Sequence, residues 1–156
     1  MRRLNTRGDT IVEVLIAILV ISVILTGAFV SARRSQAGIR QSQERVEALK
    51  MAEAQLEHIR YRVSIEPTVP YASPNTYCFD VANTRHDING AIPPLQSDNF
   101  SASVYPGSCR VMPSGVDFYN HIVLDPTTNT VTAVTRWDGY GGIGKQEVRL
   151  SVRMDP

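Results

Sequence analysis

The sequence predicts an α+β fold in which one long N-terminal helix packs on a C-terminal antiparallel β-sheet. Three observations lead to this prediction. Residues 11–30 form a predominantly apolar run, a helical pattern continues from there to about residue 63, and the C-terminal third alternates with the period of two expected of strands. With 156 residues, the chain is long enough for one domain with a small core.

The apolar run has the length of a membrane-spanning helix. It is interrupted only by Glu13, Ser22, Thr26 and Gly27. As a helix it would be about 30 Å long, which is the thickness of the hydrocarbon core of a bilayer. A helix buried in a soluble protein normally has a polar face, and this run has none after Glu13. We therefore predict that residues 9–32 form the membrane-spanning half of the helix.

The second half of the predicted helix, residues 33–63, is amphipathic. Its apolar residues recur at spacings of three and four and form one stripe: Leu49, Ala52, Leu56, Ile59 and Val63. Glu47 with Lys50, and Glu57 with Arg60, have the spacing of i,i+3 ion pairs. The apolar face of a sheet needs a cover, so we expect this stripe to pack on it.

Residues 64–156 are predicted to form a globular β head. Three prolines end the helix and indicate an extended connector: Pro67, Pro70 and Pro74. Alternation predicts three successive strands, over residues 118–124, 130–137 and 146–154. In the last strand one face is apolar and consists of Val148, Leu150, Val152 and Met154.

Shorter features fill the rest of the head. Residues 100–105 alternate as a further strand would, and residues 83–99 are predicted to be a long irregular loop. Residues 125–129 have the composition of a turn. Residues 139–144 contain four glycines and predict a flexible loop.

The chain has two cysteines, Cys78 and Cys109, both in the predicted head. Two cysteines are too few for a disulfide scaffold or a zinc ribbon. They are candidates for one disulfide if the head lies outside the cytoplasm, and for two free thiols if it does not.

The N-terminal residues form a motif of their own. A leader containing Arg2, Arg3 and Arg7 ends at Gly8, and Glu13 follows inside the apolar run. A carboxylate in a membrane segment costs roughly 2.5–3.5 kcal/mol at the helix centre and less near an end, so it usually has a partner. Cleavage after Gly8 would create an α-amino group on residue 9, and this amine could neutralise Glu13 of a neighbouring copy.

This motif resembles the processing site of type IV prepilins and of the pseudopilins of secretion and competence systems. The resemblance covers residues 1 to about 60. It implies that residues 1–8 are a leader, that a prepilin peptidase cuts between Gly8 and Asp9 and methylates the new amine, and that Glu13 pairs with that amine in a filament. The family usually has Phe or Met where this chain has Asp9, and many members have Pro where this chain has Val30.

The resemblance implies a major or minor pilin, a structural subunit that polymerises with itself or with other pilins. An assembly ATPase and a platform protein complex would be partners. The chain would span the inner membrane once before assembly and then lie in an extracellular pilus or in a periplasmic pseudopilus. The alternatives are a pseudopilin of a type II secretion or competence (DNA-uptake) system, and a membrane-anchored binding module. A nucleic acid or surface ligand stays open, although the net charge of +1 does not favour nucleic acid.

Other interpretations of single motifs remain. Thr10 with Glu13 fits a helix capping box, Asp9 fits an N-cap, and Ala32 could end a secretory signal peptide. Residues 137–142 combine aromatic residues with glycines, as a ligand-binding loop can, but an ordinary strand end has the same composition.

The sequence predicts neither catalysis nor a cofactor. The three histidines, His58, His86 and His121, lack the spacing of metal ligands, so we expect no metal site. There is no nucleophile elbow, P-loop or pair of catalytic carboxylates, so we expect that the chain is not an enzyme.

Overall fold

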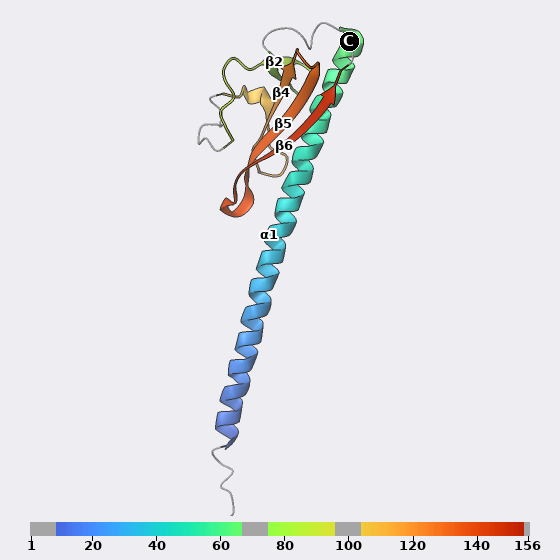
Figure 1. Cartoon of the computed structure of the whole chain (residues 1–156). Coiled ribbons are helices and arrows are strands. Elements are labelled where there is room, and N and C mark those ends of the chain that lie inside the picture. Colours follow the sequence, from blue (N-terminus) through green and yellow to red (C-terminus); the bar gives the residue numbers. More distant parts are fainter. Residues whose placement is uncertain (1–8, 67–74, 96–103, 155–156) are drawn as a thin grey trace, which may run out of the picture. The chain divides into compact units, whose positions relative to one another are not determined.

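The computed structural model describes residues 9–66, 75–95 and 104–154, and it describes residues 9 and 10 by their backbone alone. The chain comprises two compact units, residues 1–39 and 40–156. A single helix, α1 (Asp9–Ile65), runs through parts of both (Figure 1). Its bounds lie within two residues of those predicted. The prolines of the predicted connector, Pro67, Pro70 and Pro74, lie outside the described residues.

The described head contains one antiparallel sheet. Its strands are β1 (Thr76–Phe79), β2 (Arg85–Asp87), β3 (Arg110–Val111), β4 (Phe118–Asp125), β5 (Thr130–Gly139) and β6 (Gly144–Arg153). The strand order is β2-β1-β4-β5-β6, and β3 pairs with β4 beside β1. Strands β4, β5 and β6 are the three predicted from alternation. The predicted α+β fold, a long N-terminal helix packed on an antiparallel sheet, is confirmed.

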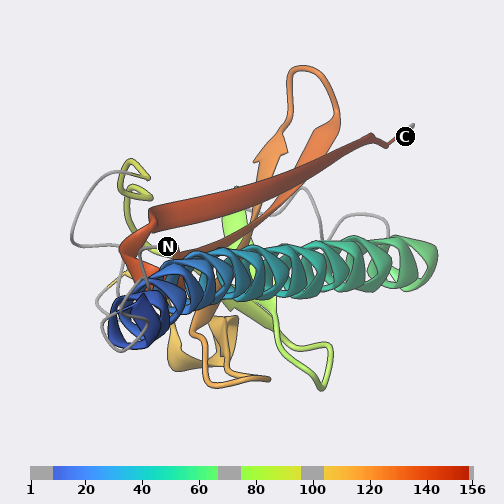
Figure 2. The same ribbon diagram turned by 90° about the horizontal axis from the view of Figure 1, so that it is seen from below.

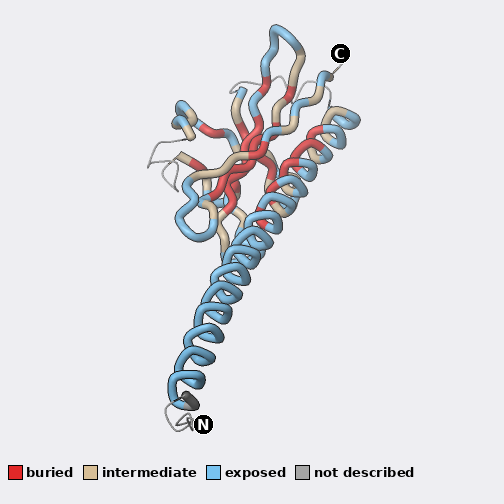
Figure 3. Tube along the Cα trace, turned by 60° about the horizontal axis from the view of Figure 1, so that its bottom comes forward, coloured by how far each residue is buried: buried red, intermediate tan, exposed pale blue. Residues whose placement is uncertain are grey.

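The main core lies between α1 and one face of the sheet. Ala52, Leu56 and Ile59 of α1 pack against side chains from the central strands, among them Ile122 and Ala133. Figure 2 shows the C-terminal part of α1 (teal to green) lying beside the sheet, and Figure 3 shows that the buried positions of α1 lie in this part. The predicted apolar face of β6 belongs to this core, with Leu150, Val152 and Met154 partly buried against it.

One position of the predicted helix stripe is wrong. Leu49 is 37% exposed, and its neighbour Ala48 is fully buried instead. Ala48 packs against Phe118 and Trp137, whose rings lie 5.8 Å apart. A small side chain lets the helix backbone approach two large rings, which a leucine at this position would push away.

Several short features of the head differ from the predictions. The segment predicted as an irregular loop over residues 83–99 contains β2, which pairs with β1. Within residues 100–105, only Val104 and Tyr105 are described, and they form a turn and a bend rather than a strand. Residues 139–144 are an ordered connection, because β5 and β6 stay paired up to Gly139 and Gly144. The turn at residues 125–129 is confirmed, and its Asp125 side chain accepts bonds from the threonines that follow.

Ion pairs along α1 follow the prediction at one of two places. Arg60 contacts Glu57 as predicted. Glu47 does not pair with Lys50 in the described structure and accepts a hydrogen bond from the Ser114 hydroxyl instead. The exposed i,i+3 pair contributes a few tenths of a kcal/mol, about 0.2–0.5, whereas the Ser114 contact joins the helix to the segment before β4.

A buried amide side chain of α1 forms two hydrogen bonds with the backbone of β1, as a neighbouring strand would. Gln55 Nε2 donates to the Phe79 carbonyl at 2.8 Å, and its Oε1 accepts from the Phe79 N–H at 2.9 Å. Both backbone groups of Phe79 are therefore satisfied by one side chain from the helix. Since an unsatisfied buried backbone group costs about 1–3 kcal/mol, this contact also fixes where β1 lies along α1.

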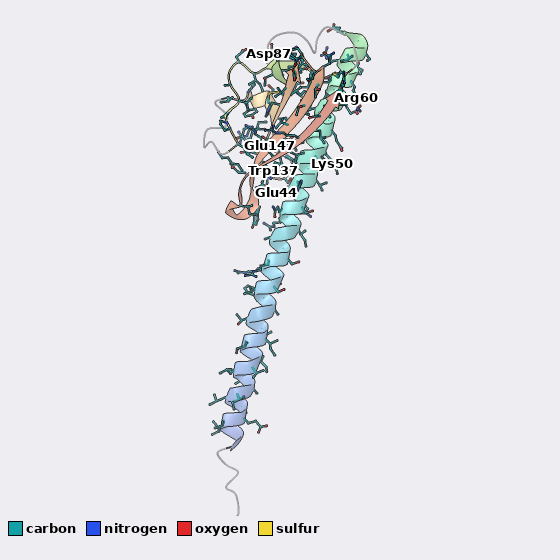
Figure 4. The ribbon with its side chains drawn as sticks, in the orientation of Figure 1. Glu44, Lys50, Arg60, Asp87, Trp137 and Glu147 are labelled. Atoms are coloured by element: carbon teal, nitrogen blue, oxygen red, sulfur yellow. A yellow bond between two sulfur atoms is a disulfide. The ribbon has the colours of Figure 1, made fainter. Side chains whose placement is uncertain are left out.

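A buried carboxylate attaches the β5–β6 hairpin to α1. Glu44 is 7% exposed, and its Oε2 accepts a hydrogen bond from Trp137 Nε1 at 3.1 Å and another from the Tyr140 N–H at 3.2 Å (Figure 4). Arg40 stacks over the Tyr140 ring, with its guanidinium carbon 4.5 Å from the ring centroid. Trp137 is thus a buried structural residue, and its ring is not available for the ligand stacking considered for this loop.

Candidate functional site

The N-terminal part of α1 exposes a large apolar surface. Between residues 11 and 30, fourteen large apolar side chains are exposed. Burying such a side chain stabilises by about 1.5–3 kcal/mol, so covering the whole surface is worth on the order of 20–40 kcal/mol. This exceeds the total stability of a typical domain, about 5–15 kcal/mol. By length and composition, this part of α1 qualifies as a candidate membrane span.

Glu13 is the one ionisable side chain between residues 11 and 32. It is exposed, and it has no hydrogen-bond or ion-pair partner among the residues that the structure describes. The two hydroxyls of the run do have partners. Ser22 donates to the Ile18 carbonyl at 2.7 Å, and Thr26 donates to the Ser22 carbonyl at 2.8 Å. In an apolar environment Glu13 would therefore be the polar side chain that still needs a partner.

A basic segment follows the apolar run. Arg33 lies over the Phe29 ring, with its guanidinium carbon 4.3 Å from the ring centroid, and Arg34 comes next. Long basic side chains at the end of an apolar helix can keep their stems on apolar surface and their charges in water. The predicted membrane-spanning half, residues 9–32, would end at this basic segment.

The other residues of the predicted N-terminal motif are only partly described. Gly8 and the rest of the leader lie outside the described residues. Asp9 and Thr10 lie within α1, whereas a capping residue precedes the first helical residue, and their side chains are not described. Cleavage and methylation at the bond between Gly8 and Asp9 therefore stay predictions.

The two cysteines lie in the head, far from Glu13 in the sequence. Cys78 of β1 and Cys109, at the end of the 3-10 turn η2 (Gly107–Cys109), form a disulfide with a Cα–Cα distance of 5.7 Å. Both are buried in a second, smaller core with Ile88, Tyr105 and Tyr119. This core lies on the face of the sheet opposite the one that packs on α1.

The histidines are spread over the head. His58 packs beside Phe79, and His86 Nε2 contacts Asp80 Oδ2 at 2.9 Å. His121 is buried on β4 beside Tyr105. Among the described residues, no three potential metal ligands come together.

A buried polar network on this second face was not predicted from the sequence. Arg136 Nε donates to Glu147 Oε2 at 2.6 Å, and the Arg136 side chain is only 5% exposed. Glu147 also pairs with Arg149. Burial raises the pKa of Tyr105 to about 12, in spite of the nearby Arg136 charge, so its hydroxyl stays protonated.

His121 makes the stability of this network depend on pH. Burial, followed by the charge of Arg136, lowers the pKa of His121 to about 3. In the unfolded chain its pKa is about 6.5, so below that pH the unfolded state takes up a proton that the folded state does not. The stabilisation that comes from keeping His121 neutral is therefore present above about pH 6.5 and is lost progressively as the pH decreases.

We expect the free energy of unfolding to fall by about 1.5–2 kcal/mol between pH 6.5 and pH 5 because of His121. The carboxylates of Asp125 and Glu147, whose pKa values are lowered, contribute only at more acidic pH. Urea unfolding of the full chain in detergent micelles, followed by the fluorescence of Trp137, measures the change. His121→Gln should lose this part of the pH dependence, and an equal slope in both proteins would contradict the assignment.

The apolar run with its unpartnered Glu13 is the strongest candidate for a functional site, because both features call for contacts that the described chain does not supply. Such a surface can associate with lipid and with other helices. No family model, no curated protein and no solved structure matches this chain.

Proposed function

We propose that this chain is the structural subunit of a type IV pilus-like filament, made as a prepilin and polymerised through its N-terminal helix. The observation that carries the proposal is Glu13, a lone carboxylate in an exposed apolar helix, at the fifth position after Gly8. Cleavage after Gly8 supplies the missing cation, because the new amine on Asp9 of one copy reaches Glu13 of the next. The carboxylate is unpaired in the monomer and paired in the polymer.

The exposed apolar surface supports the same proposal. Lipid covers residues 9–32 before assembly, and the helices of other subunits cover them in the filament. Covering this surface stabilises the subunit by on the order of 20–40 kcal/mol, so a subunit leaves the bilayer only for an equally apolar environment. A core of parallel helices provides that environment, with the heads outside.

The disulfide in the head supports export. Disulfides persist in oxidising compartments and are rare in the cytoplasm, so a head closed by Cys78 and Cys109 belongs on the outer side of the membrane. The leader with its arginines then lies in the cytoplasm, where a prepilin peptidase, an assembly ATPase and a platform protein act on the chain. Single-pass insertion in the inner membrane precedes assembly.

Cleavage at Gly8 is the first test of this proposal. We expect the mature wild-type chain to begin at Asp9 with a methylated amine, and Gly8→Val to accumulate as the full-length precursor, because a branched side chain obstructs the scissile bond. Intact-mass measurement of both chains, purified from membranes that contain a prepilin peptidase, distinguishes these products.

Gly27→Val is the matched control for this experiment. It makes the same change inside the apolar run, where no heavy atom lies within 4 Å of the added Cβ. It should be processed like the wild type. A wild-type chain that keeps residues 1–8, or a Gly8→Val chain that is still cut after residue 8, would contradict the proposal.

A further inference from the structure

The face of the sheet turned away from α1 holds a partly covered cavity. On this face, His121 of β4, Val134 of β5 and Arg149 of β6 are direct neighbours across the strands. The next row on this face, toward the turn that joins β4 and β5, consists of Val123, Thr132 and Ser151. A cavity of about 360 Å³, which we call the far-face cavity, lies between these rows and the segment of residues 92–94. This volume lies in the range of pockets that hold small molecules, about 300–1,000 Å³.

The wall of the far-face cavity is held in place by a buried cation. Arg136 Nη1 donates to the Pro93 carbonyl at 2.6 Å, while its Nε donates to Glu147. The guanidinium therefore fixes the segment of residues 92–94 on the sheet with charge-assisted hydrogen bonds, which are stronger than neutral ones. The side chains of this segment, Ile92, Pro93 and Pro94, give the cavity a rigid apolar wall.

The net charge of the side chains at this cavity favours the binding of an anionic ligand. Arg136 and Arg149 share one carboxylate, Glu147, so the three side chains together carry one net positive charge. Arg149 lines the cavity, its side chain is 62% exposed, and its Nε bonds to Glu147. Its Nη groups have no partner among the described residues, and the planar guanidinium suits a planar carboxylate.

His121 adds a directed donor to the same cavity. Its Nδ1 lies 3.1 Å from the Tyr105 hydroxyl, and the ring is neutral and 2% exposed. The Tyr105 hydroxyl can donate to Nδ1, and in that tautomer the neutral ring carries its own proton on Nε2. This Nε2–H has no partner among the described residues, and His121 lines the cavity.

We propose that the far-face cavity binds a small organic carboxylate, whose oxygens contact the guanidinium of Arg149 and the Nε2–H of His121. The body of the ligand is apolar and lies against Ile92 and Pro93. A polyhydroxylated acid fits less well, because this wall offers no partners for its hydroxyls. The inference concerns the head alone and does not depend on the proposed filament.

Benzoate is the probe that tests this inference, because it joins a carboxylate to a compact apolar ring. We expect it to bind the full chain in detergent micelles saturably and to shift the ¹⁵N resonance of His121 Nε2. Arg149→Gln should weaken binding by about tenfold or more, since it removes a charged donor. Arg153→Gln is the matched control, because Arg153 lies on the same face of β6, is exposed, and does not line the cavity. It should change the affinity by less than about twofold.

Two further probes separate the contribution of the carboxylate charge to binding from that of the apolar ring. Benzamide has the ring without the charge, and inorganic phosphate has the charge without the ring, so both should bind at least about tenfold more weakly than benzoate. Trp137 fluorescence confirms that each variant is folded. The inference is overturned if benzoate gives no saturable shift, if either probe binds as tightly as benzoate, or if Arg153→Gln weakens binding as much as Arg149→Gln.

Discussion

Glu13→Gln is expected to remove the chain from filaments while leaving its cleavage and membrane insertion unchanged. Glutamine keeps the size and helix propensity of glutamate but cannot pair as an anion with the amine on residue 9 of a neighbouring subunit. Loss of one partner of a buried ion pair costs about 3–5 kcal/mol, which corresponds to at least about 100-fold weaker addition of a subunit. The fraction of the chain in sheared filaments, compared with the membrane fraction, measures the effect.

Glu53→Gln is the control for this substitution. Glu53 lies on the same helix, is exposed, and has no ion-pair partner among the described residues, so the same chemical change should leave assembly intact. If Glu13→Gln subunits enter filaments as readily as Glu53→Gln subunits, Glu13 has no role in assembly, and α1 is then only a membrane anchor.

Reduction of the disulfide between Cys78 and Cys109 is expected to lower the free energy of unfolding of the head by about 3–4 kcal/mol. The sequence separation of the two cysteines is 31 residues, and opening a loop of this length returns that much conformational entropy to the unfolded chain. The two sulfurs also hold β1 to the turn before β3, beside the small core of the second face. Urea unfolding with and without a phosphine reductant, followed by Trp137 fluorescence, measures the loss.

A Cys78→Ala/Cys109→Ala double variant separates the cross-link from general effects of the reductant. Its unfolding midpoint should be low and should not respond to the phosphine. An unchanged midpoint of the reduced wild-type chain would show that the cross-link contributes nothing to stability. A double variant that responds as strongly as the wild type would show that the reductant acts elsewhere.

The parts of the fold that the sequence predicted are those with a strong period. Alternation placed β4, β5 and β6, and the apolar run together with the 3.6-residue pattern that follows it placed α1 to within two residues. The stripe was ambiguous at one point, because Ala48 and Leu49 are adjacent and each continues a spacing of three or four. The choice depends on Phe118 and Trp137, which come from strands far away in the sequence.

The missed strands lack such a period. In β1, Tyr77 and Phe79 pack in the main core and Cys78 packs in the smaller one, so both faces are buried and the sequence does not alternate between apolar and polar residues. Its neighbour β2 has only three residues and, in the described part of the head, pairs with β1 alone. Such segments acquire their structure from their partners, and a local pattern does not reveal them.

The two candidate sites also differ in whether the sequence alone could reveal them. Glu13 could be found from sequence because it is a single charge in an apolar run. The far-face cavity could not, because Arg136 and Glu147 look like residues of a solvent-exposed strand face until residues 92–94 are laid over them. A cue for this burial was present in His121, which lies among apolar residues in β4, but a histidine in a strand more often has no ligand to bind.

The paired hydrogen bonds between Gln55 and Phe79 have a mechanical consequence. Tension applied along α1 would load these two bonds together, and both would have to break before β1 could separate from the helix. From β1 the load passes through a covalent bond at Cys78 to Cys109 and then to the adjoining β3. The head is thereby coupled to its helix at a point where pulling meets resistance from several connected elements rather than from one strand.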